Sequence, residues 1–175
     1  LDQLGLYRLT DDQQLALEDI KRDLHDPTPM RRLLSGTPGS GKALIATCAV
    51  AVVGGSKSQA VWITPNASAA EFRAIFAEKM LEPAGLISML VVGEPTRSQR
   101  NAIRRGEVHV VFATPDLFEH SVEFRRLGFV VAEEEDACGV VAASVAALRA
   151  PFPDLLVLNP VPLGPDVWFQ AYSDF

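Results

Sequence analysis

The sequence predicts an α/β fold in which a mostly parallel sheet is covered by helices on both faces. Short runs of apolar and β-branched residues alternate with helical segments along the chain, an order that is typical of parallel βαβ units. One helical segment follows a glycine-rich loop that begins at Gly36 and is apolar on all sides, so we expect it to lie buried against the sheet. With 175 residues, the chain has the size of a single domain.

The elements can be assigned in order along the chain. A first helix is expected to begin near Thr10, where acidic residues follow, and to end before Pro27. A strand at 32–35 leads into the glycine-rich loop, and the buried helix spans 42–53. Further strands are expected at 60–64, 88–92, 108–113, 128–132 and 154–158, with helices at 68–80, 97–105 and 140–148. The prediction is therefore six strands, the last of them within a proline-rich tail.

Composition narrows the class of protein. The net charge of -6 argues against a surface devoted to nucleic acid, so any DNA contact must be local. No apolar run reaches the roughly 18 residues of a membrane helix, and no export signal is evident. Cys48 and Cys138 lack partners at metal-ligand spacing, which indicates neither a disulfide framework nor a zinc site. We therefore expect a location in the reducing cytoplasm. Because the chain begins at Leu1 rather than Met, we expect it to be part of a larger protein.

Residues 36–43 match the phosphate-binding P-loop pattern G-x-x-x-x-G-K-[ST], except at the last position. Such a stretch can also be a simple glycine-rich turn, but the strand before it and the buried helix after it favour a P-loop. Backbone N–H groups and Lys42 can bind phosphates, whereas Ala43 lacks the hydroxyl that coordinates Mg²⁺. ATP or ADP is therefore the expected ligand, with Mg²⁺ contributing little. The candidate nucleotide-binding residues in this loop are Gly36, Thr37, Pro38, Gly39, Ser40, Gly41, Lys42 and Ala43.

An acidic segment follows the predicted strand at 128–132. Its first members, Glu133 and Glu134, are placed like the Walker B acids that hold Mg²⁺ and orient the attacking water. Glu133 is the candidate metal ligand, but we expect it to bind Mg²⁺ poorly, because octahedral Mg²⁺ tolerates little displacement of its ligands. Glu134 is the candidate general base. The alternative is a solvated acidic turn, since four adjacent acids repel one another.

Two further groups of residues could contact nucleic acid. Arg97, Arg100 and Arg104 fall at i, i+3 and i+7, so they share one helix face that could follow DNA phosphates. The alternative for these arginines is an ordinary solvated face. Trp62 and Trp168 lie in apolar runs and are interpreted as core residues rather than base-stacking platforms.

Taken together, these motifs resemble the first motor lobe of a superfamily 2 DNA helicase, of the RecG type and next to transcription-repair coupling factors. Residues 9–13 resemble the segment whose glutamine, here Gln13, reads adenine, and 26–34 resemble the approach to the P-loop. Residues 63–66 resemble motif Ia, and 106–114 with 122–128 resemble the stretch before the Asp-Glu-x-His box. The resemblance extends along the whole chain. It implies a three-layer, RecA-like P-loop NTPase fold and an ATP-dependent DNA helicase of repair and recombination.

The departures from the family pattern cluster at its functional positions. Ala43 replaces the P-loop threonine, Glu133 replaces the metal-binding aspartate, and Asp136 stands where the family has histidine. Residues 158–161 replace the Thr-Ala-Thr segment that couples hydrolysis to movement on DNA. Asn66 and the Val-Gly-Glu at 92–94 replace residues that contact DNA in the family. These changes predict a motor lobe that has lost or reduced ATP hydrolysis.

Three functions remain open from the sequence. The first is an ATP-binding helicase lobe with impaired hydrolysis that retains nucleotide binding without Mg²⁺. The second is a structural or protein-interaction platform that uses no nucleotide, and the third is an active DNA-dependent ATPase that uses Glu133 in place of aspartate. The expected partners are a second helicase lobe or flanking domains and, through the parent protein, branched DNA, with no membrane. Nothing in the sequence indicates an oligomeric state.

Overall fold

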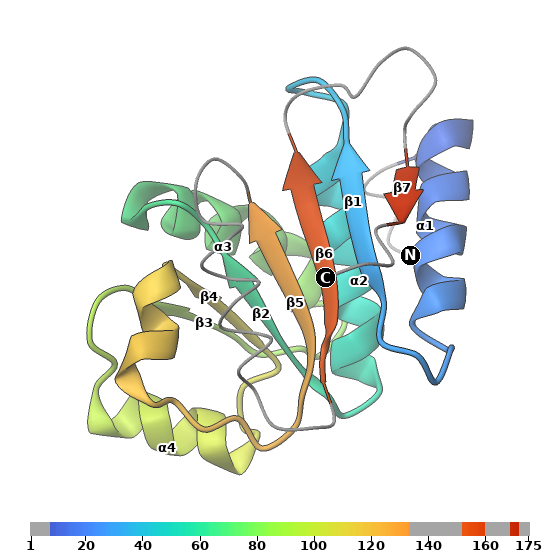
Figure 1. Cartoon of the computed structure of the whole chain (residues 1–175). Coiled ribbons are helices and arrows are strands. Elements are labelled where there is room, and N and C mark those ends of the chain that lie inside the picture. Colours follow the sequence, from blue (N-terminus) through green and yellow to red (C-terminus); the bar gives the residue numbers. More distant parts are fainter. Residues whose placement is uncertain (1–7, 134–151, 160–168, 172–175) are drawn as a thin grey trace.

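A seven-stranded sheet forms the centre of the computed structural model, which describes residues 8–133, 152–159 and 169–171 (Figure 1). The strand order is β3-β4-β2-β5-β6-β1-β7. Six strands are parallel, and only β7 runs antiparallel, against β1. The mostly parallel α/β sheet is therefore confirmed. The strands are β1 (Arg31–Ser35), β2 (Gln59–Ile63), β3 (Ser88–Val91), β4 (Val110–Ala113), β5 (Leu127–Glu133), β6 (Asp154–Asn159) and β7 (Phe169–Ala171).

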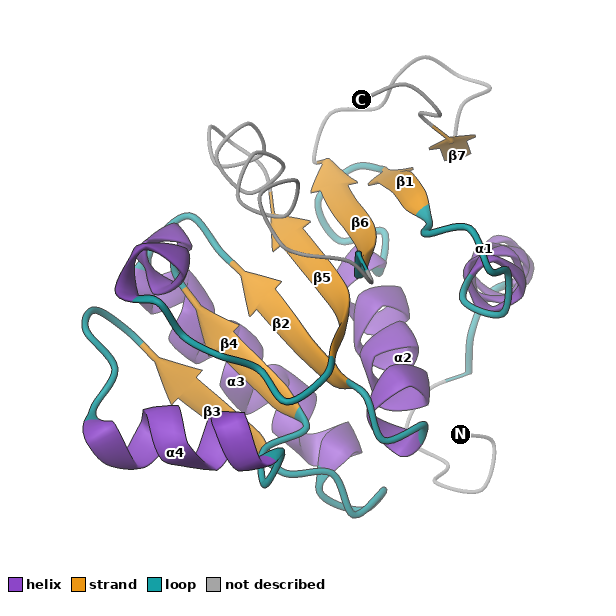
Figure 2. Cartoon of the chain, turned by 60° about the horizontal axis from the view of Figure 1, so that its bottom comes forward, coloured by secondary structure: helices purple, strands orange, loops and turns teal. Residues whose placement is uncertain are grey.

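Helices cover both faces of the sheet, as predicted (Figure 2). On one face lie α1 (Asp11–Asp23), α2 (Lys42–Gly55) and α3 (Ala67–Leu81), which pack with Trp62 and Phe112 into one apolar cluster. On the other face, α4 (Arg97–Arg105) contributes Ile103 and the 3-10 helix η2 (Pro115–His120) contributes Leu117 to a second cluster. Neighbouring strand residues alternate between the two clusters because successive side chains of a strand point to opposite faces. In the described ranges, no helix is long and apolar enough to cross a bilayer.

The helix starts follow from local capping. Thr10 accepts a hydrogen bond from the backbone N–H of Gln13, whose side chain accepts one in return from Thr10 N, and this pair forms a capping box at α1. Thr96 and Gln99 make the same arrangement at α4. Asn66 caps α3 through its side-chain oxygen, which accepts from Ala69 N at 2.9 Å. The predicted helix bounds agree closely with the structure because these caps are local signals.

Two elements are absent from the sequence prediction. The strand β7 adds an antiparallel edge to β1, with Leu33 opposite Gln170; only three residues long, it follows a proline-rich stretch and carries no clear strand pattern. The second element is η2, which begins at Pro115 after β4. The predicted helix at 140–148 lies outside the described residues. The differences therefore concern short peripheral elements, and the six predicted strands are all present.

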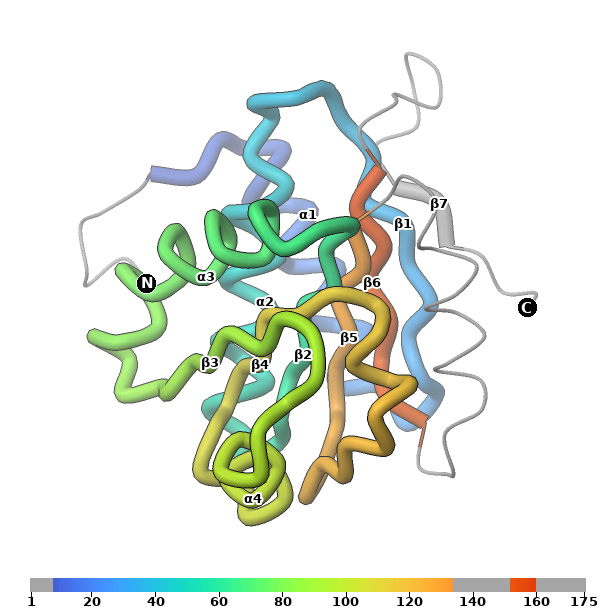
Figure 3. The backbone as a smooth tube through the Cα atoms, turned by 90° about the vertical axis from the view of Figure 1, so that its left-hand side faces the viewer, coloured from blue at the N-terminus to red at the C-terminus, as the bar shows by residue number. Residues whose placement is uncertain are grey.

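The carboxyl ends of the parallel strands bring the predicted functional segments together. β6 pairs with both β1 and β5, in a register that places Ser35 opposite Asn159 and Glu133 opposite Leu158. The glycine-rich loop after β1 and the acid that ends β5 thus lie at the same carboxyl-terminal end of the sheet, with β6 between their strands. Ligands of open parallel sheets bind at this end. The helix α4 lies at the opposite end of the molecule from this loop (Figure 3).

Candidate functional site

The glycine-rich loop adopts a conformation that requires glycine at two positions. Gly39 and Gly41 have φ angles of +85° and +90°, in the left-handed region that disfavours other L-residues. Gly41 is also the N-cap of α2 and has no side chain to accept from the first N–H groups of that helix. The start of this 14-residue helix therefore leaves backbone donors available to an anion, which the helix dipole also favours.

The Lys42 ammonium group lies within the loop itself. Its Nζ atom donates to the carbonyl oxygen of Gly36 and, at 3.0 Å, to that of Thr37. The pKa of Lys42 is lowered, mainly by burial and further by the positive charge of Arg73, while the negative charge of Glu133 opposes the change. The loop thus carries a partly desolvated cation that lies close to both of these charged groups.

Gln13 fixes the other side of the loop. Its Nε2 atom donates to the carbonyl oxygen of Ser40 at 2.9 Å, and its Oε1 atom accepts from Thr10 N at 3.1 Å. A Cβ atom added to Gly41 would lie 2.3 Å from Gln13 Nε2, so this close approach also requires glycine. The structure therefore brings the predicted adenine-reading glutamine into direct contact with the predicted phosphate loop.

A cavity of about 370 Å³ lies between α1 and the loop. Its walls include the apolar side chains of Leu15, Leu34 and Ile45, with Lys42 and Ser40 at the loop. The hydroxyl of Ser40 is buried and has no hydrogen-bond partner within the described part of the chain. A cavity of this size is within the range of small-molecule sites, and buried polar atoms without a partner are rare in native proteins.

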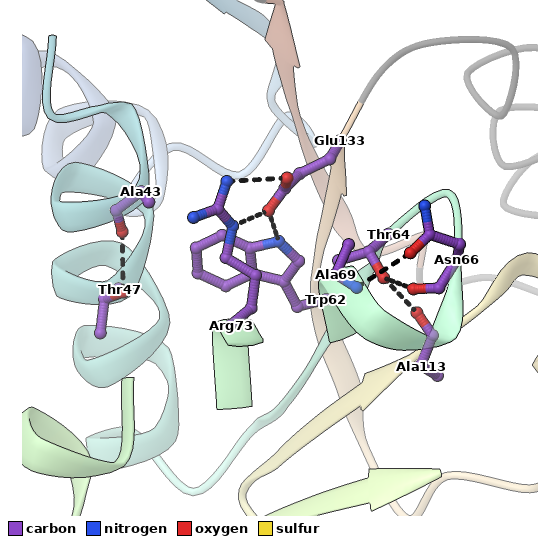
Figure 4. A network of polar contacts seen from close by, with 9 residues as sticks. All are labelled: Ala43, Thr47, Trp62, Thr64, Asn66, Ala69, Arg73, Ala113 and Glu133. Carbon is purple, nitrogen blue, oxygen red and sulfur yellow. Dashed lines mark hydrogen bonds and ion pairs between the residues drawn. The ribbon is translucent and has the colours of Figure 1, made fainter. Parts of the chain in front are cut away.

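The hydroxyl that is missing at Ala43 is not supplied by the next turn of the helix. Thr47 follows four residues later on α2 and is fully buried, but its Oγ1 atom donates to the carbonyl oxygen of Ala43 at 2.7 Å (Figure 4). This hydroxyl is therefore bonded within the helix and does not face the loop. The first turn of α2 presents a methyl group where the P-loop pattern has an oxygen ligand.

The carboxylate of Glu133 accepts hydrogen bonds from two side chains (Figure 4). Trp62 Nε1 donates to Oε1 at 2.8 Å, Arg73 Nε donates to the same oxygen, and Arg73 Nη2 donates to Oε2 at 3.0 Å. The side chain of Glu133 is only 14% exposed and that of Arg73 is 26% exposed. Both oxygens of this acid are therefore engaged in a bidentate, partly buried ion pair.

The described residues do not fit a magnesium site. Mg²⁺ requires hard oxygen ligands in near-octahedral geometry, but Ala43 offers none and both oxygens of Glu133 accept from Arg73. Among the residues that the structure describes, no group of three or more acidic, histidine or cysteine side chains is placed to hold a metal ion. The motif therefore keeps its phosphate-binding groups in this chain, whereas its metal-binding positions offer no free oxygen ligand among the described residues.

Comparisons with known proteins identify the family of the chain. Residues 10–150 match the model of the DEAD/DEAH box helicase family. The chain belongs to this family. The ATP-dependent DNA helicase RecG of Aquifex aeolicus is 31% identical over 175 residues, and RecG of Acidithiobacillus ferridurans is 30% identical over 166 residues. These alignments cover 96% and 93% of this chain but only 22% and 24% of the relatives, so the chain spans less than a quarter of their length.

Solved structures of helicases have the same fold. A structure of RecG bound to a three-way DNA junction superposes with a TM-score of 0.76 at 25% identity, covering 89% of this chain and 21% of that one. The DUF1998 helicase MrfA, bound to DNA and AMPPNP, has a TM-score of 0.70 at 18% identity and covers 96% of this chain and 26% of that one. The predicted RecG-type superfamily 2 motor lobe, with its RecA-like fold, is thus confirmed.

Within this helicase lobe, intramolecular contacts are made at two positions that the resemblance places among the family's DNA contacts. Asn66, at the motif Ia position, caps α3. Glu94, in the segment at 92–94, forms an ion pair with Arg100 at 2.8 Å. Arg100 also donates to the carbonyl oxygens of Pro95 and His120, so its guanidinium is bound to groups of the protein itself. Asn66 and Glu94 are therefore each stabilised by contacts within the chain.

The three predicted DNA-binding arginines therefore differ. Arg100 binds protein groups, whereas Arg97 and Arg104 are exposed on α4. Arg104 is within 3.5 Å of Asn101 Oδ1 on its own helix. DNA binding by these residues stays a prediction. Of the three, Arg97 and Arg104 have side chains exposed to a ligand such as DNA. The predicted general base Glu134, and Asp136, Cys138 and Trp168, lie outside the described residues.

Sequence reasoning missed Arg73 and the polar role of Trp62. Trp62 is fully buried and its ring lies 5.7 Å from that of Phe112, which confirms it as a core residue. Its indole N–H nevertheless requires an acceptor when it is buried, and this requirement is the one sequence signal for the contact with Glu133. Arg73 has no comparable signal, because it lies in the interior of α3, 60 residues from its partner.

Proposed function

We propose that this chain is the ATP-binding lobe of a RecG-like DNA helicase that binds ADP or ATP without help from Mg²⁺ and hydrolyses ATP poorly or not at all. The proposal rests on a contrast between the phosphate-binding and the metal-binding positions of one site. The loop that includes Gly41 and Lys42 has the form expected for phosphate binding, whereas Ala43 has no oxygen to offer a metal ion.

Nucleotide binding is supported by three features that converge on the same cavity. The backbone donors at the start of α2 and the Lys42 ammonium favour phosphate. Gln13 is held beside them by Thr10 and Ser40, where it could contact adenine as the family resemblance implies. The cavity of about 370 Å³ has apolar walls at Leu15 and elsewhere, which suit a base and sugar.

Impaired hydrolysis follows from what the metal ion normally supplies. In P-loop NTPases, Mg²⁺ is held by the loop hydroxyl and the Walker B acid, bridges phosphate oxygens and neutralises the charge that develops during transfer. Ala43 cannot hold the ion and Glu133 is paired with Arg73. Transition-state stabilisation by the metal should therefore be weak, whatever the role of Glu134.

The wider role is proposed from the relatives. Those that match are ATP-dependent RecG helicases, and the solved RecG structure is bound to a three-way DNA junction. We therefore propose that the parent of this lobe acts on branched DNA in repair or recombination. A second helicase lobe or flanking domains would be needed for that action, and the cytoplasm is the proposed location.

A structural platform that uses no nucleotide is the second candidate. The observation that favours it is the intramolecular use of Asn66 and Glu94 at positions where the family contacts DNA. In this case the lobe would position neighbouring domains or a protein partner, and the loop would be a remnant. The two candidates differ in one property, which is nucleotide affinity.

Isothermal titration calorimetry with ADP in EDTA distinguishes them. We expect binding by the wild type, at least about tenfold weaker binding by Lys42→Ala, and no change in the control Lys79→Ala, which alters an exposed lysine on α3. Absence of heat at millimolar ADP would favour the platform. Brisk Mg²⁺-dependent ATP turnover by the full-length protein would instead establish an active ATPase.

A further inference from the structure

The ion pair between Arg73 and Glu133 occupies the place where a helicase of this family would use a metal ion. Glu133 ends β5 at the sheet edge that also carries the phosphate loop. Figure 4 shows the Arg73 guanidinium between Glu133 and the helix that begins with Lys42 and Ala43. The lowered pKa of Lys42 has the charge of Arg73 among its causes, which places that charge within electrostatic range of the loop.

Arg73 has donors to spare after it pairs with Glu133. Its Nε and Nη2 atoms donate to the carboxylate, while Nη1 makes no hydrogen bond to the described part of the chain. Figure 4 shows this nitrogen directed away from Glu133, toward α2. A planar guanidinium that binds a carboxylate on one edge can bind a phosphate oxygen on another.

The arginine is held in position by its surroundings. The carboxylate that it binds is itself fixed by the indole of the buried Trp62, and the centre of the exposed Phe72 ring lies 5.7 Å from the Arg73 Cζ atom. A preorganised side chain loses little conformational entropy when a ligand binds. The pair is therefore unlike a surface ion pair between two mobile chains.

We propose that Arg73 is the resident cation of this nucleotide site: it neutralises Glu133, blocks its use as a metal ligand and donates to a phosphate oxygen of metal-free ADP or ATP. This inference rests on the proposed function and adds a residue and a preference to it. Lys42 and Arg73 place two positive charges beside the loop, and these charges favour the polyphosphate without a divalent ion.

The test compares ADP affinity in EDTA and in excess Mg²⁺ for four proteins. In the wild type, the two dissociation constants should agree within about twofold, a small difference on the scale of tenfold per 1.4 kcal/mol. Arg73→Gln should weaken binding in EDTA by about tenfold and should make Mg²⁺ favourable, because Glu133 is released. The matched control is Arg100→Gln, which removes another arginine that is paired with a glutamate, at the far end of the molecule, and should change neither value.

The fourth protein, Glu133→Gln, should respond in the opposite direction. Removing the negative charge leaves the full charge of Arg73 for the phosphate, so ADP should bind about threefold or more tightly in EDTA. A variant that had lost its fold would not gain affinity. Electron paramagnetic resonance of Mn²⁺ with ADP supplies a second readout: Arg73→Gln should immobilise Mn²⁺ on the protein, and the wild type should not.

Two patterns overturn the inference while the proposed function survives. One is wild-type affinity for metal-free ADP in Arg73→Gln. The other is an affinity that Mg²⁺ leaves unchanged in Arg73→Gln as it does in the wild type. A different pattern, no ADP binding by the wild type or by Arg100→Gln, overturns the proposed function and the inference with it.

Discussion

The side chain of Gln13 lies against the backbone of Gly41, close enough that a Cβ atom on the glycine would come within 2.3 Å of Gln13 Nε2. This contact joins the first helix to the phosphate loop. It also shows why the loop tolerates no side chain there, since Gly41 has a φ angle of +90° as well. The base-contacting and phosphate-contacting candidates of the site therefore depend on each other sterically.

The Gly41→Ala variant should be destabilised. The left-handed backbone costs about 1–2 kcal/mol for a residue with a Cβ atom, and Gln13 must also move away from Ser40. Urea denaturation should therefore show a loss of at least about 1 kcal/mol in the free energy of unfolding. The control is Gly55→Ala at the end of α2, where a Cβ atom meets nothing within 4 Å and the φ angle is not positive. Alanine there should be neutral or slightly stabilising, and an equal loss in both variants would contradict the steric account.

The hydrogen bond from Trp62 to Glu133 should be coupled energetically to the ion pair. Trp62→Phe removes the indole donor and some buried volume, so we expect a loss of about 2 kcal/mol or more in the free energy of unfolding. In a double-mutant cycle with Glu133→Gln, the two effects should not add, because the residues are in direct contact. Additive losses would show that the bond contributes nothing beyond packing.

As pH rises, the affinity for ADP should begin to decrease at a lower pH than it would if Lys42 had the pKa of an ordinary lysine. Only the charged form of Lys42 attracts phosphate, and its pKa lies below 10.5 because of burial and then of Arg73. Binding should weaken as pH rises through this lowered pKa. Without ligand, the same shift makes the free energy of unfolding rise with pH in that window, because the unfolded chain holds the proton more tightly. Calorimetry at a series of pH values measures the first effect, and Arg73→Gln should move it to higher pH.

Restoring the family residues should not restore a metal site while Arg73 is present. Ala43→Thr with Glu133→Asp returns the hydroxyl and the shorter acid, but we expect the Arg73 guanidinium, which pairs with Glu133, to neutralise the shorter carboxylate as well. We expect Mg²⁺ to improve ATP affinity by about tenfold only when Arg73→Gln is added. Calorimetry of the double and triple variants, with and without Mg²⁺, measures this. An equal response to Mg²⁺ in both would mean that Arg73 does not control the metal.

Much of the fold follows from local sequence signals. The capping residue Thr96 and the glycine after Arg105 set the bounds of α4, and buried strand runs predict all six parallel strands. The P-loop was predictable because its residues are contiguous. The partner of Glu133 was not, because Arg73 reaches it across 60 residues of sequence. Such a contact depends on how α3 packs over the sheet, and no periodicity encodes that placement.

The measurement that tests the account most directly is the affinity of the wild-type protein for ATP in EDTA and in excess Mg²⁺. The account predicts binding in both solutions, with dissociation constants that agree within about twofold, because Lys42 and Arg73 already supply the positive charge. An affinity that Mg²⁺ improves by about tenfold or more would contradict it.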